Sequence, residues 1–219
     1  MFVGPAAAQR ARQPRDVIEA YRVCQRFQML LAEDLDFDRA FEVTFTKDAA
    51  RRREIAIYEG DFGDLRLKKI DDAMLLRAFK ARMQIVYLML PLASPDSNEE
   101  EAMFFPPAIK AIFERKPPDT SDEFPAYAQQ LQKDASALRA HLNELAARYP
   151  RVAQRVRKFK QDLLQMPQLP ASEMVPATSY GKGHVLEPDE KYYQIGDYAV
   201  IREGSEMKII GIRFFSRLF

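Results

Sequence analysis

The pattern that decides the fold lies in residues 124–163, which read FPAYAQQLQKDASALRAHLNELAARYPRVAQRVRKFKQDL. Apolar residues recur there at intervals of three and four, from Ala128 to Leu145 and again, after Pro150, from Val152 to Leu163. This spacing places them on one face of an α-helix, and Pro150 separates two such helices. Two amphipathic helices with a short break between them predict an antiparallel helical hairpin.

The residues before this hairpin predict further helices by the same criteria. These helices are expected over about 16–33, over a short stretch after residue 36, over 49–58, over 72–92 and from about Pro106 onward. The polar and acidic segment 94–101 is expected to be a surface loop.

Capping residues indicate where several of these helices begin. Asp48 is a suitable N-cap for the helix over 49–58, and Asp71 or Asp72 for the helix over 72–92. Thr120, with Glu123 three residues later, has the pattern of a capping box before the hairpin. Arg51-Arg52-Arg53 is interpreted as a solvated helix face.

The last 29 residues differ in character, because short β-rich runs alternate there with turn residues. They predict a small antiparallel β-hairpin or three-strand meander that packs on the helices, since a lone hairpin is marginal in water. The predicted fold is therefore mainly α, with about six helices and a small C-terminal β element. One domain is expected, made of a flexible tail (1–15), a helical core (16–165), a Pro- and Gly-containing connection (166–190) and the β meander (191–219).

The composition predicts a soluble globular protein of 219 residues, with 47% apolar and 30% charged residues. A net charge of +1 gives no overall preference for nucleic acid or an anionic membrane, and no apolar run is long enough to span a membrane. One cysteine excludes an intramolecular disulfide framework, and two histidines with one cysteine exclude a zinc site of these ligands alone. No metal and no cofactor is predicted.

The N-terminal segment leaves the compartment open. Ala6-Ala7-Ala8 resembles the small-residue end of a signal peptide, but the charged and apolar segments that should precede it are missing. The chain is therefore expected to be cytoplasmic as written, and exported if the true start lies upstream.

The small net charge of the chain conceals two segments of opposite charge. Residues 96–123 carry a net charge of about −5 and residues 148–162 about +5, counted from their Asp, Glu, Lys and Arg residues. These blocks predict pairing within the fold, a protein-interaction surface, or contact with nucleic acid or an anionic surface. The candidate interaction residues, called the basic face below, are Arg148, Arg151, Arg155, Arg157, Lys158 and Lys160.

Several short motifs resemble parts of catalytic or metal sites but are incomplete. Asp34-x-Asp36-x-Asp38 lacks the glycine and glutamate of a calcium loop, so helix capping is the favoured interpretation. Asp61-Phe62-Gly63 matches a three-residue kinase motif, but the other kinase motifs are absent from the sequence, so the match is interpreted as coincidence. Cys24 is interpreted as a packing residue and His141 as a satisfied residue at the helix edge. No catalytic residue is predicted.

One segment indicates a ligand site. In residues 180–184, glycines flank Lys182 and precede His184, so the backbone could approach a ligand closely while the side chains meet an anion. The candidate ligand-binding residues are Tyr180, Lys182, His184 and Tyr193.

Three functions follow from these observations. The favoured one is a non-enzymatic protein that binds a ligand, a protein partner or a second copy of itself, because no set of nucleophile, base and orienting group can be assembled. The first alternative is a small-molecule or catalytic site between the C-terminal β element and the core helices. The second is binding of nucleic acid or an anionic surface through the basic face, residues 148–160.

Overall fold

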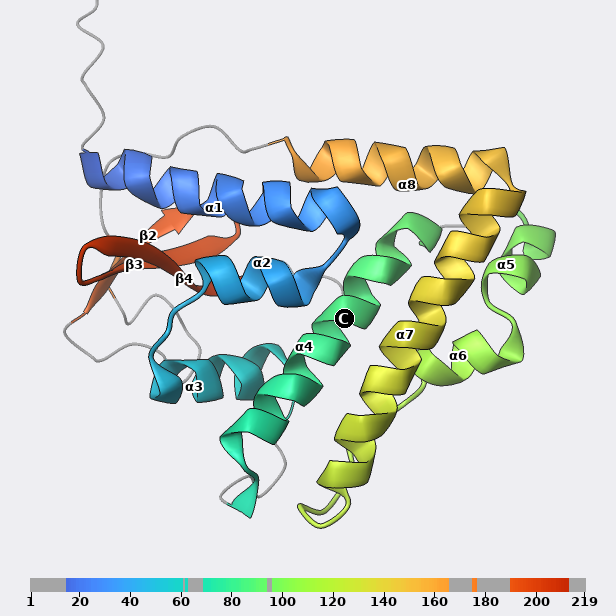
Figure 1. Ribbon diagram of the computed structural model, residues 1–219, viewed down its shortest axis with the longest axis horizontal. Coiled ribbons are helices and arrows are strands. Elements are labelled where there is room, and N and C mark those ends of the chain that lie inside the picture. Colours follow the sequence, from blue (N-terminus) through green and yellow to red (C-terminus); the bar gives the residue numbers. More distant parts are fainter. Residues whose placement is uncertain are drawn as a thin grey trace, which may run out of the picture.

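Helices form most of the molecule, and a small sheet packs against the first of them (Figure 1). The computed structural model describes residues 15–60, 62, 69–93, 96–165, 175–176 and 190–212. Within these residues it contains eight α-helices and C-terminal antiparallel strands, which confirms the predicted fold class. None of the described helices is both long and apolar enough to cross a membrane.

The first four helices are α1 (Arg15–Asp34), α2 (Phe37–Thr44), α3 (Ala49–Glu59) and α4 (Asp72–Met89). The last three begin directly after aspartates that the sequence predicts as N-caps. Asp36, Asp48 and Asp71 each accept a hydrogen bond from the backbone N–H three residues later, at 3.2, 2.8 and 2.9 Å. The capping interpretation of the Asp34–Asp38 pattern is thus confirmed for Asp36.

A pair of long helices forms the other half of the molecule. In Figure 1, α4 and α7 (Phe124–Arg148) run side by side in the same direction, and this is the most extensive helix contact. The antiparallel hairpin predicted over residues 128–163 would place α7 against α8 (Pro150–Leu163). These two helices do contact each other, but the apolar face of α7 meets mainly α4.

Two local predictions between α4 and α7 are wrong. The segment expected to be an acidic loop instead forms α5 (Asn98–Phe104), whose Ser97 side chain accepts from Glu100 N–H. Three glutamates in its first turn favour a helix N-terminus. After α6 (Pro107–Phe113), the predicted capping box is not used, because α7 begins at Phe124 without a side-chain cap.

The sheet has the order β1-β2-β3-β4, with β2 (Lys191–Ile195), β3 (Tyr198–Glu203) and β4 (Glu206–Ile212) as its three longer antiparallel strands. The two-residue strand β1 (Val175–Pro176) pairs with the start of β2. The two hairpin turns contain Gly196 at φ 57° and Gly204 at φ 59°. A two-residue hairpin turn requires such left-handed backbone, which glycine adopts without strain.

The core joins α1, α2, α4 and the sheet through a cluster of aromatic rings. Phe37 lies at its centre and contacts the rings of Phe27, Phe41, Phe45, Phe79 and Tyr87 at centroid distances of 5.7–6.4 Å. Such pairs stabilise a core beyond the area they bury. The segment after α2 extends this contact to β4, because Thr46 N–H donates to the carbonyl oxygen of Ile209 at 3.0 Å.

Polar side chains from three other helices meet at the end of α1. Gln84 of α4 donates to the carbonyl of Leu35 (2.6 Å) and accepts from the N–H of Phe37 (2.9 Å). Arg139 of α7 donates to the carbonyls of Asp34 and Leu35, and Lys160 of α8 donates to that of Glu33. These bonds satisfy carbonyls that every helix end leaves without a partner. They also stabilise Leu35, whose φ of 54° is unusual for a branched residue.

The arginine triplet on α3 is half-buried rather than solvated, so that prediction is wrong. Arg51 pairs with Glu190 at 2.6 Å, Arg52 with Glu42 at 3.1 Å, and Arg53 with Asp72. Glu42 also meets Lys80 of α4. Burial alone would raise the pKa of Glu42, but the hydrogen bonds from these two cations outweigh it and lower the pKa to about 2. The carboxylate of Glu42 therefore links α2, α3 and α4.

Candidate functional site

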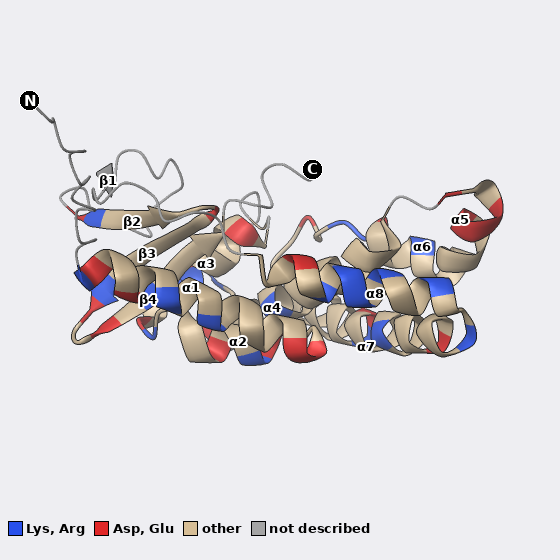
Figure 2. Cartoon of the chain, turned by 90° about the horizontal axis from the view of Figure 1, so that it is seen from above, with Lys and Arg blue, Asp and Glu red and all other residues tan. Residues whose placement is uncertain are grey.

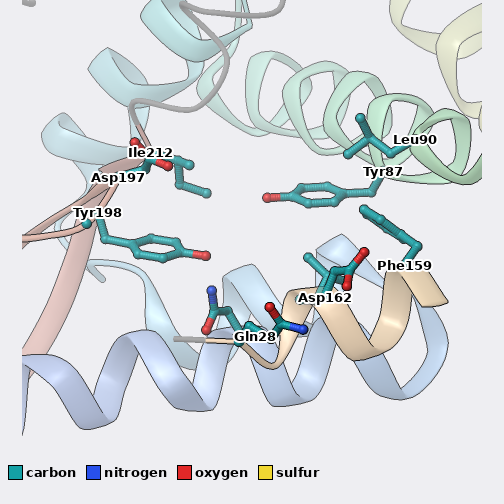
Figure 3. Close-up of a pocket in the computed structure, with 11 residues that line it drawn as sticks. Gln28, Tyr87, Leu90, Phe159, Asp162, Asp197, Tyr198 and Ile212 are labelled. Atoms are coloured by element: carbon teal, nitrogen blue, oxygen red, sulfur yellow. The ribbon is translucent and has the colours of Figure 1, made fainter. Parts of the chain in front are cut away.

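The candidate functional site is a pocket where α1, α4 and α8 meet the turn between β2 and β3 (Figure 3). We call it the tyrosine pocket. Its volume is about 520 Å³, within the range of small-molecule sites in proteins. The described residues that line it are Gln28, Tyr87, Leu90, Phe159, Asp162, Leu163, Gln165, Gly196, Asp197, Tyr198 and Ile212.

Two tyrosine hydroxyls enter the pocket from opposite sides. Tyr87 comes from α4 and Tyr198 from β3, and Figure 3 shows both hydroxyls pointing into the space between the elements. Both residues are buried, and burial is the main reason why the pKa of each phenol is raised above its ordinary value of 10. The phenols are therefore un-ionised at neutral pH and offer both a donor and an acceptor.

The amide of Gln28 adds a third polar group to the pocket. Gln28 lies one helical turn after Cys24 on the buried face of α1 and is only 8% exposed. Its N–H group donates to the hydroxyl oxygen of Tyr198. Its carbonyl oxygen has no hydrogen-bond partner in the described part of the chain. Because buried polar groups are nearly always satisfied, this oxygen is an acceptor that a ligand's donor could use.

The rest of the wall is apolar, with carboxylates at two points. Asp162 comes from the end of α8 and Asp197 from the β2–β3 turn, while Lys, Arg and His are absent from the described lining. Asp162 pairs with Lys158 at 2.6 Å, but Lys158 is 72% exposed, so this pair contributes only a few tenths of a kcal/mol. The apolar lining residues are Leu90, Phe159, Leu163 and Ile212.

The predicted ligand-binding residues lie apart from this pocket or outside the described residues. Tyr180, Lys182 and His184 belong to the part of the chain that the structure does not describe. Tyr193 is buried on β2, and its hydroxyl donates to Asp16 at 3.3 Å. It is not among the lining residues. The pocket nevertheless lies between the β element and the core helices, the place that the first alternative function requires.

The basic face is largely engaged within the fold. Figure 2 shows Lys and Arg along α8 and the acidic residues of α5 beside its first turns. Arg155 lies 2.8 Å from Asp96 and 3.1 Å from Glu100, and its guanidinium lies 5.3 Å from the ring centre of Phe104. Arg151 contacts the same two carboxylates.

The other four residues of the basic face differ in their contacts. Arg148 pairs with Glu144 at 3.7 Å, and Lys158 with Asp162. Lys160 donates to the end of α1. Arg157 is exposed and makes no contact with another charged group in the described residues. The two opposed charge blocks therefore meet each other at α5 and the start of α8.

A second hollow lies on the surface between α1 and α8. Two of its lining residues, Met29 and Leu164, are 57% and 51% exposed, which is unusual for large apolar side chains. Its volume is about 560 Å³, and its other lining residues are Arg26, Leu30, Ala32, Glu33, Lys160 and Gln161. Met29 and Leu164 thus form an exposed apolar patch on the described chain. We call this hollow the α1–α8 groove.

Cys24 is buried and His141 is hydrogen-bonded within the described structure. Burial raises the pKa of the Cys24 thiol, which opposes formation of a nucleophilic thiolate. His141 donates from Nε2 to the carbonyl of Phe104 at 2.9 Å, as expected of a satisfied histidine. No group of three His, Cys, Asp or Glu side chains is arranged to hold a metal ion within the described ranges.

Comparison of the chain with protein-family models, with curated protein sequences and with solved structures gave no match.

Proposed function

We propose that this protein is a non-enzymatic binding protein whose ligand is a small organic molecule held in the tyrosine pocket. The observation that carries the proposal is the convergence of Tyr87, Tyr198 and Gln28, from three separate elements, on one hollow with otherwise mostly apolar walls. A predominantly apolar pocket with a few convergent polar groups is typical of small-molecule sites.

Packing alone gives no reason for this arrangement. The carbonyl oxygen of Gln28 is removed from water without a hydrogen-bond partner in the described residues, which costs free energy. Such a cost is typical of sites that retain polar groups for recognition. The described lining of the tyrosine pocket contains no Ser, Thr, Cys, Lys or His, which supports binding rather than catalysis.

The experiment uses 2-phenylethanol as a neutral probe, which has an apolar ring and one hydroxyl. Titration of ¹⁵N-labelled protein should shift the side-chain resonances of Gln28 and the backbone resonances of Gly196 and Tyr198. For a probe of nine heavy atoms, the dissociation constant should be about millimolar.

Two neighbouring substitutions provide a matched pair. Leu163→Trp places a larger side chain at the pocket wall and should abolish the shifts, whereas Leu164→Trp, outside the pocket, should leave them unchanged. Shifts that survive in Leu163→Trp would place the probe elsewhere. An absence of any saturable shift at these positions would refute the proposal.

A homodimer is a second candidate, because Met29 and Leu164 expose apolar surface side by side on the α1–α8 groove. Light scattering at about 100 μM should then give twice the chain mass, and the double variant Met29→Lys/Leu164→Lys should give a monomer. A wild-type monomer at that concentration would contradict it. Nucleic-acid binding through Arg151 and Arg155 would require these residues to leave their carboxylate partners.

A further inference from the structure

We infer that the ligand of the tyrosine pocket is an organic cation, namely a primary amine with an apolar body. This inference rests on the proposed function, because it names the class of molecule that the same pocket binds. Three independent properties of the described lining support it: its charge, its aromatic rings and the polarity of its unpartnered group.

The charged residues of the described lining are all acidic. Asp162 and Asp197 lie on different elements, and no cationic residue accompanies them in the described lining. The negative charge of Asp197 acts on both phenols, since it contributes to the raised pKa of Tyr87 and of Tyr198. An ammonium group would be attracted to this field, whereas a carboxylate or phosphate would be repelled.

The existing partner of Asp162 does not prevent this role. Lys158 reaches Asp162 from the preceding turn of α8, and both side chains are largely exposed, at 72% and 45%. An exposed pair of this kind is weak and easily exchanged. A ligand cation partly removed from water could therefore take the place of Lys158 at this carboxylate.

Aromatic rings surround the same space. Tyr87, Phe159 and Tyr198 all line the pocket, and the faces of such rings attract cations, most strongly where water is excluded. The un-ionised phenol oxygens can accept hydrogen bonds from an ammonium group. Gln28 also leaves an acceptor, not a donor, without a partner. Recognition by acceptors and rings favours a donor-rich cation.

The test compares three probes that share a phenylethyl body and differ in the terminal group: 2-phenylethylamine, 2-phenylethanol and 3-phenylpropionate. Their dissociation constants are measured at pH 7 from the resonances of Gln28, Gly196 and Tyr198. The amine should bind about tenfold more tightly than the alcohol, and the carboxylate most weakly. The preference for the amine should diminish as salt is raised from 50 to 500 mM.

A charge variant and its control separate the pocket carboxylates from the overall charge. Asp162→Asn/Asp197→Asn should bring the amine-to-alcohol ratio close to one while the alcohol still binds. Asp119→Asn/Asp122→Asn changes the net charge equally at exposed positions before α7 and should leave the ratio unchanged.

The outcomes distinguish this inference from the proposed function. If the alcohol binds in the pocket and the amine binds no more tightly, or the carboxylate binds best, the inference is overturned and the proposed function stands. If the preference survives in Asp162→Asn/Asp197→Asn, it does not arise from the pocket and the inference is also overturned. If none of the three probes shifts the pocket resonances, both are overturned.

Discussion

Replacement of Gln84 by leucine tests whether one amide stabilises the junction between α1 and α2. Gln84 makes hydrogen bonds to the N–H of Phe37 and to the carbonyl of Leu35. Leucine has a similar size and a similar preference for helix, so the substitution removes these bonds and changes little else in α4. Arg139 still donates to the Leu35 carbonyl at 3.0 Å, so the N–H of Phe37 is the group left unsatisfied.

The expected loss of stability follows from these contacts. An unsatisfied, part-buried donor costs about 1–3 kcal/mol, and loss of the second hydrogen bond costs about 0.5–1.5 kcal/mol. The leucine side chain, in a half-buried position, recovers about 1 kcal/mol through apolar burial. We therefore expect Gln84→Leu to lower the free energy of unfolding by about 2 kcal/mol.

Urea unfolding at pH 7, followed by circular dichroism and by tyrosine fluorescence, measures this difference. Hydrogen exchange at the Phe37 amide should also become faster in Gln84→Leu, which ties the loss to the named bond. Gln154→Leu, on the exposed side of α8, is the control and should change stability by less than about 0.5 kcal/mol. Wild-type stability together with unchanged exchange at Phe37 would refute the reasoning.

Three further predictions concern other contacts. Because the pKa of Glu42 is lowered to about 2, its contribution is present above about pH 4.5 and is lost as the pH falls toward 2. Glu42→Gln should thus cost about 1 kcal/mol at pH 7, after allowance for solvent screening, and nothing near pH 2; an equal cost at both pH values in urea titrations would contradict this. Arg155→Ala should cost about 1–2 kcal/mol in the same assay and Arg157→Ala under about 0.5; equal effects would show that the carboxylate pairs of Arg155 contribute nothing. Cys24, buried and with a raised pKa, should react with Ellman's reagent only as the protein opens, so reaction as fast as that of a free thiol would exclude the described packing of α1.

The features that the sequence predicts correctly depend on residues that are close together in the chain. The N-caps at Asp36 and Asp48 and the buried stripe of α1 all depend on residues within one or two turns. The sequence also misled locally, because three consecutive glutamates were interpreted as a loop although they stabilise the start of α5. The apolar spacing of residues 128–163 predicts a helical hairpin, but it does not show that α7 packs mainly on α4. Periodicity identifies an apolar face and not the helix that covers it.

The tyrosine pocket had no local signature, because its residues come from α1, α4, α8 and the β2–β3 turn. One signal was present, however. Gln28 falls one turn after Cys24 on an otherwise apolar stripe, and Gln84 interrupts an apolar run in the same way. Both amides proved to be buried or part-buried and hydrogen-bonded. A polar residue on an otherwise apolar helix face therefore indicates a buried hydrogen bond or a binding site. The sequence alone does not distinguish these two roles.

Strand β3 contacts residues near the start of the chain, so these contacts can form only late in synthesis. Thr46 contacts Glu203 across 157 residues, and Asp16 contacts Arg202 across 186. During translation, the apolar stripe of α1 therefore stays exposed until almost the entire chain has been synthesised, because the strands that cover it are the last to leave the ribosome. Contacts of such long range slow folding and prolong the exposure of apolar surface. The nascent chain is thus expected to depend on chaperones more than a helical protein of this size with local contacts would.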